Sequence, residues 1–272
     1  MEKWAELKQS HKNLSAAAAS TYDEIYHNSN HATGIYMRYE EDLIHSIIDR
    51  LPGKSHAVVL GSGTGRESFA MARYFDRVTG LDFSPEMTEV AFKNQEKRKI
   101  QNTSFVTLDV ENDPLPFENQ SVDFINSTFG MGSFVLNPAS LFLEIKRVLK
   151  KDGRVIFSFY NSQAFVNQLQ LGWTPAISSR LNHEEKALEV QFGGQIYFVP
   201  VVPYSVTEIR GELERFFSIH SITTFPSISS IFPQELFEND RVRKLCLEAD
   251  LFLAGNLELA GGPFIVAEVG NK

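Results

Sequence analysis

The sequence predicts an α/β protein built on a parallel sheet. Short apolar runs alternate with helical segments from residue 57 to residue 159. Strands connected in this way are buried on both faces, because right-handed crossovers place the helices above and below the sheet. A glycine-rich turn, Gly61 to Gly65, follows the first apolar run directly. A strand, a glycine turn and a helix form the entrance to a nucleotide site in open sheets of this kind.

The alternating segments divide into five strands and three helices. Strands are expected at residues 57–60, 77–82, 103–109, 122–127 and 154–159, and helices at 66–75, 85–97 and 138–149. Ser84 is placed to cap the second helix, and Pro85 occupies its first position, where a proline loses no hydrogen bond. The polar run Lys150 to Gly153 is interpreted as the turn that ends the third helix.

The flanking segments follow other patterns. Residues 1–34 are predicted to form one or two helices, and residues 36–51 carry an apolar stripe at helical spacing. After Tyr160 the strongest signal is a β-hairpin, because two strand-like runs flank Gly193-Gly194. The hairpin strands are expected at 188–192 and 195–199, later helices at 207–217 and 239–255, and later strands at 218–225 and 264–269.

Composition excludes several classes of function. The 272 residues carry a net charge of −8, which argues against a general nucleic-acid binder. No apolar run approaches the ~20 residues that span a bilayer. The first residues lack the apolar core of a signal peptide, and the lone Cys246 is typical of a reducing compartment, so a cytoplasmic location is expected. His11, His27 and His31 show no metal-ligand spacing and are interpreted as surface residues.

The glycine turn is a poor match to a pyrophosphate site. Arg66 stands where a dinucleotide fingerprint has its third glycine, and no Gly-Lys-Ser/Thr follows as in a P-loop. Asp82 ends the second strand 21 residues after Gly61, where a carboxylate can accept both ribose hydroxyls of an adenosine. Asp109 ends the third strand and can accept from the exocyclic amine of a purine. An adenosine ligand without pyrophosphate is therefore expected.

The glycine turn, Asp82 and Asp109 resemble the corresponding motifs of the class I S-adenosylmethionine-dependent methyltransferase family. The resemblance covers roughly residues 55–160. It rests on the glycine motif Val58–Gly65, the ribose motif Gly80–Met87, the adenine motif Leu108–Val110 with 114–117 and 122–124, and the segment Phe142–Arg154. One departure is Val59, because the family often has an acidic residue two positions before the first glycine.

The resemblance implies the cofactor S-adenosyl-L-methionine and a set of contacts to it. Four residues of the turn, Gly61, Ser62, Gly63 and Gly65, would lie along its methionine part, and Ser127 would border the sulfonium. Asp82 would take the ribose hydroxyls, and Phe83 and Met87 would pack beside the adenine. Asp109 would take the adenine amine, with Val110 supplying a backbone contact. It also implies a doubly wound, mostly parallel seven-stranded sheet with an antiparallel last strand. The expected domains are a helical lid at 1–52, a Rossmann-like cofactor domain at 53–160 and 205–272, and an inserted substrate cap at 161–204.

The methyl acceptor leaves no local signature. Methyl transfer is an in-line displacement that depends on alignment and exclusion of water, so no catalytic residue is assigned. Aromatic residues near the expected lid and cap are the candidates for closing the site: Tyr22 over the sulfonium, and Tyr26, Tyr160, Trp173, Tyr197 and Tyr204 on the substrate side. Packing within the core is the alternative role for each.

Three functions remain open at this stage. The acidic charge and the single insertion favour a methyltransferase for a small or medium organic acceptor. A protein or RNA methyltransferase is the second possibility, although the basic run Lys93 to Lys99 is interpreted as a solvated helix face. A non-catalytic S-adenosylmethionine-binding protein is the third. The sequence leaves the oligomeric state open.

Overall fold

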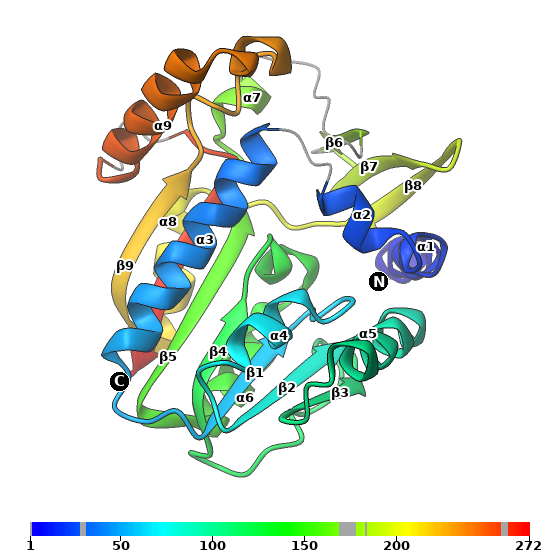
Figure 1. Ribbon diagram of the computed structural model, residues 1–272, viewed down its shortest axis with the longest axis vertical. Helices are drawn as coiled ribbons and strands as arrows, with labels where there is room; N and C mark the ends of the chain where they lie inside the picture. Colours follow the sequence, from blue (N-terminus) through cyan, green and yellow to red (C-terminus); the bar gives the residue numbers. More distant parts are fainter. Residues whose placement is uncertain (1, 28–30, 169–177, 183, 257–260) are drawn as a thin grey trace.

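A seven-stranded sheet runs through the middle of the molecule (Figure 1). The computed structural model describes residues 2–27, 31–168, 178–182, 184–256 and 261–272. In spatial order the strands are β3 (Thr103–Thr107), β2 (Arg77–Asp82), β1 (His56–Leu60), β4 (Val122–Ser127), β5 (Leu149–Tyr160), β10 (Phe264–Asn271) and β9 (Phe217–Phe225). β1 to β5 pair in parallel, and β10 is antiparallel to both of its neighbours. The predicted fold class and antiparallel last strand are confirmed.

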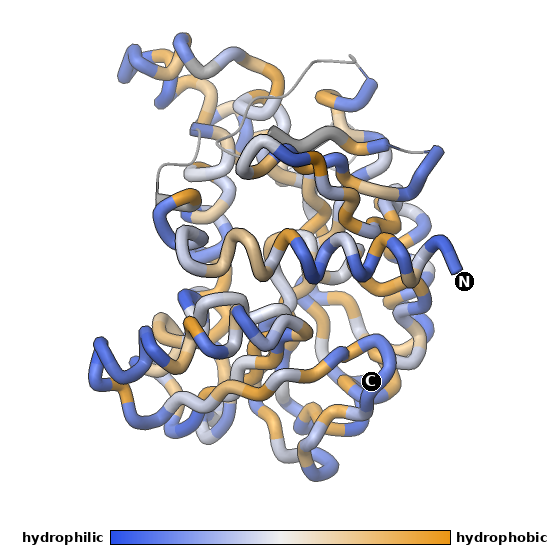
Figure 2. The backbone as a smooth tube through the Cα atoms, turned by 90° about the vertical axis from the view of Figure 1, so that its right-hand side faces the viewer, coloured by the Kyte–Doolittle hydropathy of each residue, from blue (hydrophilic) through white to orange (hydrophobic). Residues whose placement is uncertain are grey.

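Helices cover both faces of this sheet. α3 (His31–Arg50) and α4 (Arg66–Met71) pack on one face through an apolar cluster that includes Ile47, Met71 and Val59. α6 (Pro138–Val148) and α8 (Val206–Phe216) pack on the opposite face, with Phe142 and Leu213 fully or almost fully buried. Figure 1 shows α3 crossing in front of the sheet and α8 behind it. In Figure 2 the apolar residues run along the interior and the hydrophilic ones gather on outer turns and loops.

Within residues 57–159, two predicted boundaries are wrong by four or more residues, and β3 ends at Thr107 rather than at residue 109. β5 begins at Leu149 rather than at residue 154, because Leu149 pairs with Val122 and Lys150 Nζ holds the Asp123 carboxylate at 2.8 Å. The run from Lys150 to Gly153 therefore belongs to the sheet. α4 ends at Met71 rather than at residue 75, because the Asn102 side-chain amide donates to two carbonyls in the following turn. Tertiary hydrogen bonds set both ends.

The remaining elements flank the seven-stranded sheet or extend from one end of it. They are α1 (Glu2–Ala18), α2 (Tyr22–His27), α5 (Pro85–Arg98), α7 (Phe165–Gln168), the antiparallel strands β6 (Ser178–Asn182), β7 (Ala187–Phe192) and β8 (Gln195–Pro200), α9 (Asp240–Ala254) and two 3-10 turns, Met131–Phe134 and Gln234–Glu238. β7 and β8 confirm the predicted hairpin, and both glycines of its turn have positive φ. β6 adds a third strand that was not predicted. The division into lid, cofactor domain and cap stays a prediction.

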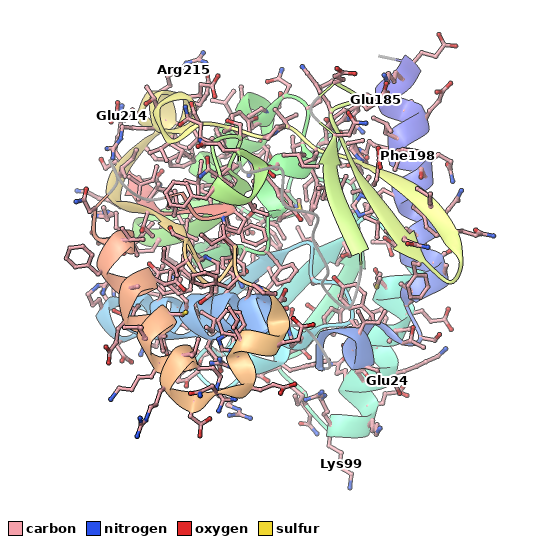
Figure 3. All side chains as sticks on the ribbon, turned by 90° about the horizontal axis from the view of Figure 1, so that it is seen from above. Glu24, Lys99, Glu185, Phe198, Glu214 and Arg215 are labelled. Atoms are coloured by element: carbon pink, nitrogen blue, oxygen red, sulfur yellow. The ribbon has the colours of Figure 1, made fainter. Side chains whose placement is uncertain are left out.

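The cap strands and the N-terminal helix contact each other directly. The backbone N–H of Phe198 on β8 donates to Ser10 Oγ on α1 at 2.8 Å. Leu14 of α1 packs against an apolar cluster formed by Leu188, Val190 and Val199. Figure 3 shows Phe198 at the side of the cap that faces α1. α1 and the β7–β8 hairpin are therefore joined by both a hydrogen bond and an apolar contact.

The glycine turn tolerates no side chain at its last position. Gly65 has φ 95°, and a Cβ there would lie 2.7 Å from Phe69 and 2.9 Å from Phe105. We expect Gly65→Ala to lower the free energy of unfolding by about 1–3 kcal/mol, because a left-handed backbone and an overpacked contact both cost energy. Urea unfolding measures this change.

A glycine of α8 provides the matched control. A Cβ added at Gly211 meets no described atom within 4 Å. Gly211→Ala is expected to raise the free energy of unfolding by about 0.5–1 kcal/mol, since alanine loses less backbone entropy in a helix. Equal effects of the two substitutions would contradict the packing described at Gly65.

Candidate cofactor and acceptor site

A cavity of about 1010 Å³ opens where the carboxyl ends of β1, β2 and β4 meet. The chain changes direction in the sheet between β1 and β4, and ligands of open α/β sheets bind at such a switch point. Its described walls come from four regions: the glycine turn and strand ends, the loop after β4, the N-terminal helices and the cap. They include Gly61, Gly63, Leu81, Asp82, Phe83, Met87, Asp109, Val110, Phe129, Met131, Lys8, His11, Tyr22, Tyr36, Tyr160, Leu188, Val190, Val199 and Phe264.

Asp82 joins the end of β2 to the glycine turn. Its Oδ2 accepts from the Gly63 N–H at 2.8 Å and its Oδ1 from the Ser84 N–H at 2.9 Å. Burial raises the pKa of this carboxyl from 3.8 to about 6, although the two N–H donors act in the opposite direction. Asp82 has 7% of its surface exposed and lies on the cavity wall, so its remaining lone pairs are available to a hydroxyl donor.

The wall at Asp109 is connected to α1 by an ion pair. Lys8 Nζ lies 2.6 Å from Asp109 Oδ2 and 2.7 Å from Glu111 Oε2. The Trp4 indole also donates to Glu111 at 3.2 Å. Burial disfavours the charged form of Asp109, but the bonds from Lys8 and Asn112 leave its pKa below the ordinary value. Asp109 therefore anchors α1 as well as lining the cavity.

The structure places the predicted cofactor residues in two groups. Eight of them line the cavity: Tyr22, Gly61, Gly63, Asp82, Phe83, Met87, Asp109 and Val110. Ser62 and Ser127 are buried beside it, and the space next to Gly65 is filled by Phe69 and Phe105. Ser127 Oγ has no hydrogen-bond partner among the described residues. The contact of each of these residues with a cofactor stays a prediction.

The predicted substrate residues are more scattered. Tyr160 lies on the cavity wall. Tyr204 packs edge-on against Phe159 in the core, and the Tyr197 hydroxyl donates to Gln195 at 3.0 Å, so neither lies on the described wall. Trp173 and the side chain of Tyr26 lie outside the described residues. For Tyr204, the alternative role of packing within the core is the one observed.

Several wall residues were not predicted. His11 was expected on the surface, which is wrong, because its ring lies 4.7 Å from the Phe83 ring and 5.3 Å from the Phe134 ring. Burial and the charge of Lys8 lower its pKa to about 4, so the imidazole is neutral. Tyr36 also lines the cavity, and its hydroxyl donates to the buried Glu40. Tyr36 and Glu40 lie four residues apart on α3, a helical spacing visible in the sequence.

Other kinds of site find no support. Within the described part of the chain, no group of three or more His, Cys, Asp or Glu side chains is arranged to hold a metal ion. Across those same residues, no helix is both long and apolar enough to cross a bilayer.

Comparison with known proteins agrees with this geometry. Residues 58–157 match the family described as methyltransferase domain. A probable S-adenosylmethionine-dependent methyltransferase of Saccharomyces cerevisiae is 26% identical over 177 residues, which make up 61% of this chain and 60% of the yeast protein. A demethylmenaquinone methyltransferase of Tropheryma whipplei is 37% identical over 108 residues, 39% of this chain and 43% of that protein.

The fold is also found among solved structures. The crystal structure of a Pyrococcus horikoshii protein has a TM-score of 0.58 at 18% identity, covering 87% of this chain and 91% of that one. This similarity shows the fold. The chain spans about half the length of the curated relatives it matches.

The sheet order and the switch-point cavity are those of a Rossmann-like, doubly wound α/β fold, and residues 58–157 match the methyltransferase-domain family. Through residues 58–157 the chain is similar to S-adenosylmethionine-dependent methyltransferases. The site is suited to that cofactor, because Gly61 and Gly63 expose backbone to the cavity with φ 67° and 52°. A Cβ on Gly61 would lie only 3.2 Å from Met131 Sδ.

Proposed function

We propose that this chain transfers a methyl group from S-adenosylmethionine to a small or medium-sized organic acceptor. The observation that carries the proposal is one cavity that extends from the Asp82 wall to an apolar region under the cap. S-adenosylmethionine supplies a methyl group on a positively charged sulfur. The residues of the chain would bind the adenosine at Asp82 and Asp109, align the acceptor and exclude water.

The contacts of α1 around the cavity support a small acceptor over a polymer. α1 and β8 lie against each other, and Lys8 attaches α1 to the strand ends. Lys8 is the single lysine or arginine in the described cavity wall, and two carboxylates neutralise it. A nucleic-acid acceptor would need positive charge near the reaction site. The Tropheryma relative is named demethylmenaquinone methyltransferase, and this name describes a small-molecule acceptor for that relative.

A two-stage experiment tests this function. Calorimetry with S-adenosylmethionine and S-adenosylhomocysteine should give saturable binding at one site per chain. Incubation with donor labelled in its methyl group and a metabolite extract should then produce labelled small molecules that an Asp82→Ala chain does not produce. Binding without labelled product would favour a non-catalytic S-adenosylmethionine-binding protein. Label confined to protein or RNA would favour a protein or RNA methyltransferase.

A further inference from the structure

Hydrogen bonds connect the loop after β4 to a buried carboxylate on α3. The Gly130 N–H donates to Ser158 Oγ at 2.6 Å, and the Ser158 hydroxyl bonds to that of Tyr36. The Tyr36 hydroxyl donates to Glu40 Oε1, which also accepts the Phe129 N–H at 3.1 Å. The chain of bonds therefore has a single direction, and Glu40 accepts at its end.

The members of this chain differ in their access to the cavity. Both residues are buried, with 0% of Tyr36 and 4% of Glu40 exposed, but Tyr36 belongs to the described cavity wall and Glu40 does not. Tyr36 is held in place by stacking on Phe264 at 4.1 Å between ring centroids. A molecule in the cavity would therefore meet Tyr36 and would reach Glu40 through the tyrosine hydroxyl.

The wall beside Tyr36 is apolar and aromatic. Phe129, Tyr160 and Phe264 approach one another around it, with ring contacts between 5.1 and 6.1 Å. On the cap side the wall is formed by Leu188, Val190 and Val199. Because Lys8 alone supplies a positive charge to the wall as described, and it is paired at the Asp109 end, an anionic acceptor would lose its hydration without gaining a partner.

We propose that Tyr36 and Glu40 form a proton relay for an uncharged aromatic acceptor that attacks through a hydroxyl group. This inference rests on the proposed methyl transfer. As the acceptor oxygen bonds to the methyl carbon, the methyl–sulfur bond breaks and its electron pair stays on sulfur. The hydroxyl proton passes to Tyr36 Oη while the Tyr36 proton passes to Glu40 Oε1. Tyr36 ends unchanged, and the carboxylate ends as a carboxylic acid.

The environment of Glu40 is suited to this role. Burial raises the pKa of its carboxyl to about 7, despite bonds from Tyr36 and Phe129 that lower it. From α4, the negative charge of Glu67 raises this pKa further and the positive charge of Arg66 lowers it. A base with a pKa near neutrality can both take up and release a proton. Since only the ionised form accepts the proton, transfer should increase as the pH rises through about 7.

Three naphthalene compounds of similar shape test the inference. The affinities of 2-naphthol, naphthalene and 2-naphthoate are measured by fluorescence on the chain saturated with S-adenosylhomocysteine. We expect 2-naphthol to bind about tenfold more tightly than naphthalene, because it gains one hydrogen bond. We expect it to bind about tenfold more tightly than 2-naphthoate as well, because it carries no uncompensated charge. Tyr36→Phe should remove the preference over naphthalene. Glu40→Gln keeps an acceptor for both donors, so it should keep the affinity.

Label transfer then separates the relay from simple binding. With labelled S-adenosylmethionine, 2-naphthol should gain the methyl group at a rate that rises through pH 7, and Glu40→Gln should lower this rate at least about tenfold and flatten the rise. Tyr39→Phe is the matched control, because Tyr39 lies on the same helix and its hydroxyl bonds to Thr223. Glu41→Gln, at an exposed neighbour, is the second control. Both should leave affinity and pH profile unchanged.

Failure of this inference can be told from failure of the proposed function. If the chain binds S-adenosylmethionine but 2-naphthol binds no better than 2-naphthoate, or if Tyr36→Phe keeps its preference, the hydroxyl acceptor is wrong. If Glu40→Gln retains the pH profile, the relay is wrong. If calorimetry detects no S-adenosylmethionine binding, the proposed function is wrong and the relay with it.

Discussion

Asp82→Ala is expected to weaken S-adenosylmethionine binding at least tenfold, as measured by calorimetry. The carboxylate is the buried charge at the end of β2, and hydrogen bonds to a charged group contribute about 1.5–3 kcal/mol each. The substitution also leaves the N–H groups of Gly63 and Ser84 without their acceptor. Asp82→Asn retains one side-chain oxygen and should fold more readily, while still losing the charge.

The pH dependence of cofactor affinity is an independent test of the role of Asp82. Burial raises the pKa of Asp82 to about 6, so the group is increasingly protonated below that pH. Ribose hydroxyls donate to the ionised form, and cofactor affinity should therefore fall as the pH drops through 6. Without cofactor the sign is opposite for folding, because an acid whose pKa is raised in the folded state stabilises the fold at low pH and loses this contribution as the pH rises through 6.

A control at the other end of β2 distinguishes loss of the binding site from damage to the strand. Asp76 is exposed and directly precedes β2, so Asp76→Ala should change neither affinity nor its pH profile. An Asp82→Ala chain that is folded by circular dichroism and binds S-adenosylmethionine with unchanged affinity would overturn the ribose assignment.

The sequence reveals those parts of the site that are built from consecutive residues. The apolar run Ala57 to Leu60 before Gly61 predicts β1, and all four of its residues are buried. The Ser84 cap is also local, since its hydroxyl accepts from the Met87 N–H. Alternating strands and helices then predict the sheet, and a parallel sheet brings the ends of β1, β2 and β4 together.

The rest of the site depends on contacts that no local pattern encodes. Lys8 and Asp109 are 101 residues apart, and neither residue type nor spacing relates them. Tyr36 and Glu40 show the spacing of one helix face, but the sequence does not reveal that Phe129 and Ser158 meet them there. Tyr204 shows the converse, an aromatic residue near the insertion that packs in the core. Val59 likewise has a core role, almost fully buried in the cluster that includes Tyr36.

Removing the cap hairpin is expected to separate cofactor binding from methyl transfer. The Val201 N–H donates to the Lys186 carbonyl at 2.9 Å, so residues 187–200 can be replaced by two glycines without moving either end. The excision removes Leu188, Val190 and Val199 from the cavity wall but leaves Asp82 and the glycine turn in place. Affinity for S-adenosylhomocysteine should stay within a few-fold of the intact chain.

Methyl transfer to the acceptor found by the labelling screen should fall at least about a hundredfold in the excised chain, because an acceptor without its wall is poorly aligned and open to water. Gly193→Asn is the matched control, since asparagine tolerates the φ of 58° at this turn and keeps both strands. Circular dichroism must show that the excised chain is folded, because Leu14, Phe134 and Tyr160 lose apolar contacts. A folded chain that still transfers methyl groups at the original rate would mean that the acceptor binds away from the cap.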